Sequence, residues 1–252
     1  MNLFDISGKK AIVTGGAGDL GTSMVEGLLE NGSEVIILDN SPRLSEVVDG
    51  FKARGFKVHG ISANLADREG LEKSFEKAMT IFGEQLDILV NAAGIQRRYK
   101  SEEFPPEEWD LVININMTAS FRLCQLAGKV MLKQGSGKII NVASMLSFFG
   151  GFTVPAYAAS KGGVAQFTKA LCNEWADKGI NINAIAPGYM DTQMNVNIIN
   201  DPTRNDEISK RIPAKRWGTG QDMKGVVIFL ASQASDYLNG AVIPVDGGYL
   251  VR

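Results

Sequence analysis

The sequence contains almost no histidine, since His59 is the only one among 252 residues. Histidine is the usual general base of catalytic triads and the commonest metal ligand in proteins. Its scarcity nearly excludes a histidine-based triad and a histidine-rich metal site, and we predict no bound metal. Proton transfer in any active site then falls to tyrosine, lysine, aspartate or glutamate. His59 itself lies in a predicted strand and is expected to be structural.

Cysteines, long apolar runs and basic tracts are also scarce. The two cysteines, Cys124 and Cys172, lie far apart in apolar segments, which is typical of buried free thiols. No apolar run reaches eighteen residues, so we expect no membrane span. The first residues, MNLFDISGKK, do not resemble a signal peptide, which favours a cytoplasmic location. With a net charge of -2 and no basic tract, neither nucleic acid nor a membrane surface is an expected partner.

Short apolar segments alternate with helical patterns along the whole chain. Such alternation predicts a Rossmann-type, doubly wound α/β sandwich, with a seven-stranded parallel sheet and helices on both faces. The expected strands are 11–14, 35–39, 58–62, 88–91, 139–143, 182–186 and 241–245. The expected helices are 20–31, 41–54, 67–82, 106–134, 157–178 and 221–231, where apolar residues recur at spacings of three and four.

No repeat or long linker divides this pattern, so residues 1–252 are predicted to form one domain. One stretch does not fit the alternation. Residues 189–215 are rich in Asn, Asp and Met and contain two prolines, which indicates a long excursion between the sixth strand and the last helix. Loops of this length in a compact domain are usually functional lids or disordered. We expect a lid over the substrate.

Glycines and other small residues follow the first and fourth predicted strands. The first strand runs into TGGAGDLG and then directly into a helix, and the fourth runs into NAAG. Glycines at a strand-to-helix turn let backbone N–H groups and the helix N-terminus approach a diphosphate. A plain tight connection is the alternative, but the place on the first βα turn favours dinucleotide binding. The expected contacts are Gly15, Gly18, Asp19, Leu20, Gly21, Asn91, Ala92, Ala93 and Gly94.

Asp39 ends the second predicted strand, eighteen residues after Gly21. An acidic side chain there accepts hydrogen bonds from the adenosine ribose and repels a 2′-phosphate, so NAD(H) is favoured over NADP(H). Asp39 could also be an ordinary turn residue, and both interpretations can hold together. Arg43 is near enough in sequence to reach a phosphate, which keeps NADP(H) as the less favoured cofactor.

Tyr157 and Lys161 are four residues apart, and Ser144 lies thirteen residues upstream of the tyrosine. If the segment is helical, the phenol and the ammonium share one face. A neighbouring cation favours phenolate, so Lys161 is expected to lower the pKa of Tyr157 and to make the phenol an acid and base. A solvated helix face is the alternative, because this spacing alone is not specific.

These motifs, in order, resemble the short-chain dehydrogenase/reductase family over nearly the entire chain. The segments that carry the resemblance are TGGAGDLG, Asp39, NAAG, Asn116, Ser144, YAASK, Pro187-Gly188 and VDGG. The resemblance implies a catalytic tetrad of Asn116, Ser144, Tyr157 and Lys161, in which Asn116 anchors a proton-relay water. It also implies adenine contacts from Asn64 and Leu65, nicotinamide-side contacts from Tyr157, Lys161, Pro187, Gly188 and Thr192, and a homotetramer.

The chain departs from the family pattern at three positions. Asp19 stands where the glycine motif usually has its middle glycine, so the local phosphate geometry is in question. Ala92 replaces the second asparagine of the usual NNAG, and Asn64 stands where aspartate is common. Neither of the last two changes removes a catalytic group.

Arg97 and Arg98 follow the fourth strand directly, at the end where open α/β sheets bind ligands. Arginine grips carboxylates in two-point contacts, so a sugar acid is the expected small-molecule substrate, although both could be solvated loop residues. Other segments resemble family members that oxidise deoxygluconate and, next, gluconate. The expected substrate contacts are Arg97, Arg98, Ser144, Met145, Tyr157, Tyr189 and Met194. A reductase of 3-oxoacyl thioesters or other carbonyls, and a nucleotide-sensing protein without turnover, are the alternatives.

Overall fold

The computed structural model describes residues 2–252, and its seven strands form one parallel sheet. This confirms the predicted doubly wound fold. The strand order is β3-β2-β1-β4-β5-β6-β7. The strands are β1 (Lys10–Thr14), β2 (Glu34–Asp39), β3 (Val58–Ser62), β4 (Ile88–Asn91), β5 (Gly137–Val142), β6 (Ile180–Pro187) and β7 (Val242–Val245). Since the chain runs outward from β1 to β3 and then returns to β4, the order reverses between β1 and β4. Ligands bind at such reversal points, outside the carboxyl ends of the strands.

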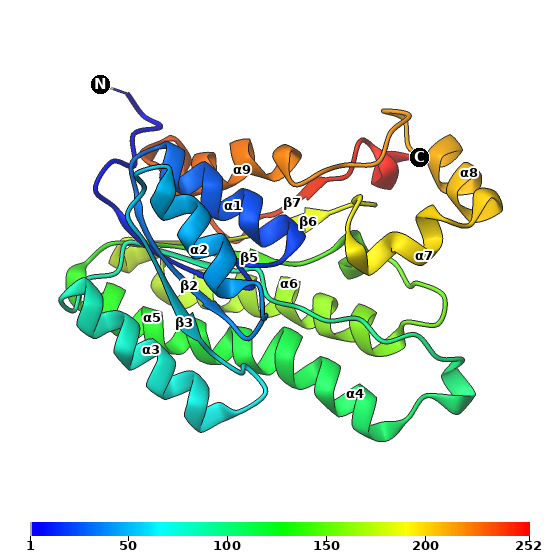
Figure 1. Ribbon diagram of the computed structural model, residues 1–252, viewed down its shortest axis with the longest axis horizontal. Helices are drawn as coiled ribbons and strands as arrows, with labels where there is room; N and C mark the ends of the chain where they lie inside the picture. The colour runs from blue at the N-terminus through cyan, green and yellow to red at the C-terminus, as the bar shows by residue number, and fades with distance from the viewer. Residues whose placement is uncertain (1) are drawn as a thin grey trace.

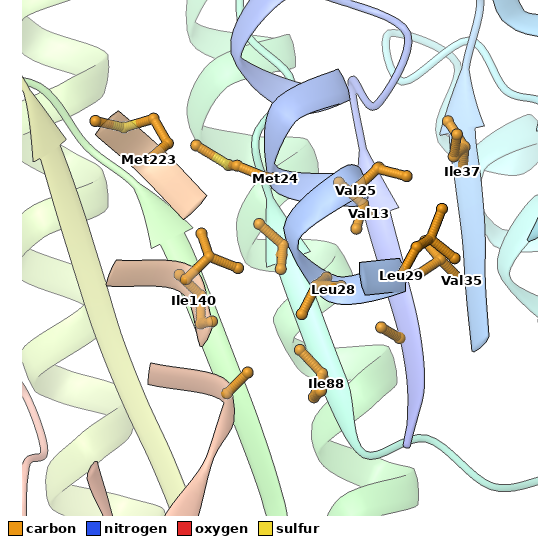
Figure 2. Close-up of a cluster of buried hydrophobic side chains, with 14 of the residues drawn as sticks. Val13, Met24, Val25, Leu28, Leu29, Val35, Ile37, Ile88, Ile140 and Met223 are labelled. Carbon is orange, nitrogen blue, oxygen red and sulfur yellow. The ribbon is translucent and has the colours of Figure 1, made fainter. Parts of the chain in front are cut away.

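Helices cover both faces of the sheet (Figure 1). On one face lie α1 (Asp19–Glu30), α2 (Leu44–Ala53) and α9 (Gln221–Ala231), and on the other lie α3 (Arg68–Phe82), α4 (Pro106–Ile113), α5 (Ser120–Gln134) and α6 (Pro155–Trp175). Figure 2 shows how α1 packs, with Leu28 and Leu29 directed at the sheet beside Val35 and Ile88. Burial of each such side chain contributes roughly 1.5–3 kcal/mol, so the helices are held firmly on the sheet. Among residues 2–252 no helix is long and apolar enough to cross a membrane.

The helix expected over 106–134 is interrupted. A π-helical turn, Asn114–Ala119, separates α4 from α5. The side chain of Asn116 lies inside this turn and is fully buried. Wider turns of this kind appear frequently at functional sites, and apolar periodicity alone cannot reveal one because the flanking helices keep the same face.

The 189–215 segment was expected to be a long loop between the sixth strand and the last helix, but it contains two helices. These are α7 (Val196–Ile199) and α8 (Pro202–Arg211), after a 3-10 turn at Gln193–Asn195. Asp201 caps α8, because its carboxylate accepts hydrogen bonds from the amides of Thr203 at 3.0 Å and Arg204 at 3.1 Å. An N-cap aspartate followed by proline is a helix-start signal, and the prediction from sequence missed it here.

The base of this segment is tied together and packs on the VDGG turn. The amide of Asp191 donates to the carbonyl of Gly218 at 2.8 Å, which joins the segment's entry and exit. Gly247 and Gly248 have φ values of +63° and +87°. A Cβ on Gly248 would lie 3.0 Å from Pro213, so the two glycines allow the end of the segment to approach closely. The chain then ends in a 3-10 turn, Tyr249–Val251.

The few histidine and cysteine side chains have structural surroundings. His59 lies on β3 with its Nε2 atom 3.2 Å from Oε1 of Glu34. Both cysteines are free thiols; Cys124 is buried, which raises its pKa to about 12, whereas Cys172 is only partly buried. Within residues 2–252 no group of three or more His, Cys, Asp or Glu side chains could hold a metal ion.

Candidate active site

A cleft of about 400 Å³ opens at the carboxyl ends of the central strands. It extends from the end of β2, past the glycine turn, to the start of α6 and the first residues of the 189–215 segment. The predicted site residues that line it are Gly15, Gly18, Asp19, Leu20, Gly21, Asp39, Asn64, Leu65, Ala92, Ala93, Gly94, Ser144, Tyr157, Lys161, Pro187, Gly188, Thr192 and Met194. Motifs from seven parts of the chain therefore meet in one place. Sequence reasoning missed other residues that line the cleft, among them Ile95, Met190 and Asn195.

The glycine turn leaves room for an anion at the start of α1. Gly15 has a φ of +67°, and a Cβ on it would lie 2.7 Å from the Cα of Ala93. A Cβ on Gly21 would collide with the carbonyl of Gly15. Helix α1 follows Gly18, which has no side chain to cap the first turn. The first-turn N–H groups thus face the cleft without a capping side chain, as a diphosphate requires, and the residues present fit a dinucleotide.

The carboxylate of Asp39 is fixed at the end of β2, where it lines the cleft. Its Oδ2 atom accepts a hydrogen bond from the amide of Ala17 at 2.9 Å, and its Oδ1 atom accepts one from the amide of Ser41 at 2.8 Å. A carboxylate has about four acceptor positions, so two remain for other donors. The expected turn role and the expected ribose-binding role are therefore compatible.

Asn91 lies behind the cleft floor and does not line it. Its side-chain amide donates to Oδ1 of Asn141 on β5 at 2.9 Å and to the carbonyl of Ser120 at 3.3 Å. Since Asn91 is 2% exposed, the side chain braces β4 against β5 and α5. Asn91 therefore supports the floor of the cleft from behind, and its direct contact with a cofactor stays a prediction.

Lys161 and Tyr157 lie on the first two turns of α6, which begins at Pro155. The Nζ atom of Lys161 is 5.7 Å from the centre of the Tyr157 ring and donates to the carbonyl of Val142 at 2.6 Å. Lys161 is 3% exposed, and burial lowers its pKa to about 8. The predicted helical pairing is present, with the ammonium held between the phenol and the end of β5.

Ser144 reaches the same place from the end of β5. It caps a 3-10 turn, Met145–Ser147, and its Oγ atom accepts a hydrogen bond from the amide of Leu146 at 3.1 Å. The hydroxyl of Ser147 accepts from the amide of Ser144 at 3.3 Å and donates to the carbonyl of Lys161 at 2.7 Å. Ser147, which sequence reasoning missed, therefore fixes the Ser144 backbone to α6.

The pKa of Tyr157 differs from the expectation. Burial raises it, while a hydrogen bond with Ser144 and the positive charge of Arg98 lower it. The cation that acts on the phenol is thus Arg98, and Lys161 is not among the causes. The desolvation of the ring outweighs its neighbours here, so the phenol favours the protonated form in this arrangement.

Asn116 connects the floor of the site to α6. Its Oδ1 atom accepts from the amide of Ile95 at 2.8 Å, and its Nδ2 atom donates to the carbonyl of Ile95 at 2.9 Å and to the hydroxyl of Ser160 at 3.1 Å. A Cβ on Gly94 would lie 3.4 Å from Oδ1 of Asn116 and 3.5 Å from Nζ of Lys161. Gly94 therefore keeps the gap between these two side chains open, where the expected relay water would lie.

The structure separates the two adjacent arginines. Arg97 donates from Nε to Oε2 of Glu108 at 2.7 Å. Within residues 2–252 no carboxylate forms an ion pair with Arg98, and its charge acts on the phenols of Tyr189 and Tyr157. Partial burial also lowers the pKa of Arg98. Arg98 does not line the cleft itself, but it is the arginine whose charge acts on Tyr157 and remains available to an anionic ligand there.

The other predicted substrate residues divide similarly. Met194 lines the cleft, whereas Met145 is buried beneath α8 with Ile208 and Tyr249. The ring of Tyr189 packs edge-on against Trp217 at 5.3 Å and Tyr249 at 5.2 Å. These aromatic rings form a platform under the 189–215 segment and hold the Tyr189 phenol near Arg98.

Comparison with known proteins decides the family. The model of the short chain dehydrogenase family matches residues 9–203. The chain belongs to this family. It is 46% identical to the 2-dehydro-3-deoxy-D-gluconate 5-dehydrogenase of Bacillus subtilis over 99% of this chain and 97% of the relative. The short-chain dehydrogenase fold expected from the motifs is thus confirmed, and so is the resemblance to sugar-acid enzymes.

Two solved structures of short-chain dehydrogenases are closely similar. One, from Agrobacterium tumefaciens, is provisionally assigned as a 2-deoxy-D-gluconate 3-dehydrogenase and contains NADP; it is 44% identical, covers 100% of both chains and has a TM-score of 0.93. The other, from Beutenbergia cavernae, is provisionally assigned as an NAD(P)-dependent gluconate 5-dehydrogenase and contains NADP at low occupancy. It is 40% identical over 100% of both chains, with a TM-score of 0.96.

Proposed function

We propose that the protein is an NAD(H)-dependent dehydrogenase that interconverts a secondary alcohol and a ketone on a deoxy sugar acid. The observation that carries the substrate class is Arg98, whose guanidinium forms no ion pair within residues 2–252 and acts on the Tyr157 phenol. The favoured substrate is 2-dehydro-3-deoxy-D-gluconate, on which the 46% identical Bacillus relative acts. 2-Deoxy-D-gluconate is the second candidate, and gluconate oxidised at carbon 5 is the third.

The four tetrad residues divide the chemistry among them. A nicotinamide dinucleotide bound in the cleft supplies the hydride acceptor or donor. Tyr157 takes the hydroxyl proton during oxidation and returns it during reduction. The Oγ atom of Ser144 accepts a hydrogen bond from the amide of Leu146, so its O–H group is left to donate a hydrogen bond to the reacting oxygen of the substrate. Lys161 and Asn116 lead the proton from the phenol towards solvent.

The direction in which the pKa of Tyr157 is shifted determines whether the resting phenol is ready for oxidation or for reduction. Since burial raises the pKa of Tyr157, the protonated phenol is ready for ketone reduction. Oxidation needs phenolate, and the positive charges of Arg98 and of an oxidised nicotinamide favour it. We therefore expect oxidation to accelerate as pH rises and reduction to slow at the highest pH.

NAD(H) is the proposed cofactor because a fixed carboxylate stands where a 2′-phosphate would bind. Asp39 is held by the amides of Ala17 and Ser41, so it cannot easily turn away from that phosphate. NADP in the two similar structures supports the other cofactor, as does Arg43 nearby. We propose further that residues 189–215 act as a lid, and the homotetramer remains a prediction.

One assay tests these proposals together. The three sugar acids, their uncharged lactones and a 3-oxoacyl thioester would be offered with NAD(H) or NADP(H), and cofactor turnover followed by absorbance. We expect turnover of a sugar acid with NAD(H), a far weaker reaction with its lactone and none with the thioester. Turnover of the thioester alone would show instead that the protein is a reductase of 3-oxoacyl thioesters. NADH binding without turnover of any substrate would favour the nucleotide-sensing protein.

A further inference from the structure

Asp19 connects the glycine turn to the 189–215 segment. Its Oδ2 atom accepts a hydrogen bond from the amide of Gln193 at 2.8 Å, across 174 positions of sequence. Its Oδ1 atom lies 3.8 Å from Nη1 of Arg43. The carboxylate is 35% exposed, so it lies at the surface of the cleft and not beneath it. Asp19 therefore lines the cleft and can meet a ligand that enters it.

This contact crosses the cleft where a dinucleotide would lie. Gly18 and Leu20 line the cleft on one side of it, and Thr192 and Met194 line the cleft on the other. Gln193 is also the first residue of the 3-10 turn that opens the segment. The carboxylate therefore joins the proposed diphosphate site to the first turn of the proposed lid.

The charge of Asp19 acts in two opposite ways. As the first residue of α1, the carboxylate interacts favourably with the positive end of the helix dipole. A diphosphate is attracted to the same end for the same reason. Two anions close together repel each other, and at this exposed position the repulsion is weakened but not removed. The carboxylate and a diphosphate hence compete for the start of α1.

We propose that Asp19 is a positioning residue that latches the 189–215 segment to the glycine turn and weakens dinucleotide binding in exchange. The inference rests on the proposed dinucleotide binding but not on any sugar acid. Arg43 and the Gln193 amide offset part of the carboxylate charge, so a dinucleotide that draws Arg43 towards itself strengthens the competition. Asp19 thereby sets how tightly the cofactor is held before and after turnover.

Two variants separate the charge from the latch. Asp19→Asn keeps an oxygen that can accept from Gln193 and removes the charge, while Asp19→Gly removes both. NADH affinity would be measured by fluorescence titration without substrate, and hydrogen–deuterium exchange of the peptide that contains the Gln193 amide would be measured without NADH. Asp67→Asn is the control for the loss of a carboxylate at the start of a helix, because Asp67 caps α3 and does not line the cleft.

We expect both Asp19 variants to bind NADH about three- to tenfold more tightly, because the repulsion between the carboxylate and the diphosphate is removed. The gain in affinity should shrink as the salt concentration rises, because salt screens that repulsion. Exchange near Gln193 should rise several-fold in Asp19→Gly and little in Asp19→Asn, and the control should change neither quantity. Unchanged or weaker NADH binding in both variants would overturn the competition, and unchanged exchange in Asp19→Gly would overturn the latch. Failure of wild-type protein to bind NADH would instead refute the proposed function, whereas absence of sugar-acid turnover would leave this test intact.

Discussion

The two walls of the cleft are built in different ways. The wall at the strand ends consists of glycine backbone and buried side chains, such as Lys161 at 3% and Ser144 at 7% exposure. The wall formed by residues 189–215 is largely exposed and rests on the edge-on contacts of Tyr189 with Trp217 and Tyr249. The first wall places the reacting groups rigidly, while the second supplies charge and shape for the substrate. Changes in the first should therefore alter kcat, and changes in the second should alter KM.

The largest effect is expected from Tyr157→Phe, in the rigid wall. The substitution removes the proton donor and keeps the ring, so kcat should fall by about 10³-fold or more while NADH affinity stays within about twofold. Steady-state kinetics and NADH titration measure the two quantities. Tyr237→Phe is the control, because Tyr237 is fully exposed. A variant with near-normal kcat would remove the proton-transfer role from Tyr157.

The same contrast explains what the sequence could predict. All seven strands were identifiable because strands buried on both faces of a parallel sheet have nearly continuous apolar sequences. The residues at the strand ends were identifiable because their tight turns need glycine. The π turn around Asn116 was not, since its cause is a set of hydrogen bonds to Ile95 and Ser160 that lie distant in sequence. The separation of Arg97 from Arg98 depended likewise on Glu108, whose position only the folded chain reveals.

Lys161→Met should have the next largest effect. We expect a loss of about 10²-fold or more in kcat, because the variant lacks the ammonium that leads the proton from the phenol towards solvent. The stability of the variant should not fall with its activity: at neutral pH it should equal or exceed that of the wild type. Burial lowers the pKa of Lys161 from 10.5 to about 8, so between these values the unfolded chain binds more protons than the folded protein. The free energy of unfolding therefore rises with pH across that window.

The variant should lose this pH-dependent contribution, because methionine does not titrate. Urea unfolding of both proteins at several pH values from about 7 to 10.5 measures the difference. Below pH 8 the variant should be at least as stable as the wild type, and the gap should narrow as pH rises. A variant that is less stable than the wild type at neutral pH, with a deficit that shrinks as the lysine loses its proton, would show that the ammonium stabilises the fold.

Arg98→Gln and Arg97→Gln test the two arginines after β4, of which Arg98 lies close enough to the 189–215 wall for its charge to act on Tyr189. Arg98→Gln should raise KM for the sugar acid about 10- to 100-fold and leave KM for the lactone nearly unchanged, because only the acid offers a charged partner. Arg97→Gln should change both substrates alike and by only a few fold, since Arg97 is paired with Glu108. Equal effects of Arg98→Gln on acid and lactone would remove the carboxylate contact from the proposal.

The smallest effect is expected from Trp217→Phe, beneath the 189–215 segment. The Nε1 atom of Trp217 donates to Oδ1 of Asn205 at 2.9 Å and to the hydroxyl of Ser209 at 3.2 Å, which fixes α8 over the aromatic platform. Phenylalanine keeps an aromatic ring against Tyr189 but loses both hydrogen bonds, at a cost of about 1 kcal/mol each. KM should rise a few fold at constant kcat, because α8 carries Arg204, whose charge acts on Arg98 and Tyr189.

Trp109→Phe provides the comparison, because this partly exposed tryptophan lies on α4, outside the segment. It should leave KM unchanged. If Trp217→Phe lowers kcat and spares KM, the segment contributes to the chemical step, and the division between a rigid reacting wall and an adaptable binding wall fails. If KM alone rises, substrate affinity depends on how firmly α8 is held by the hydrogen bonds from the Trp217 indole nitrogen.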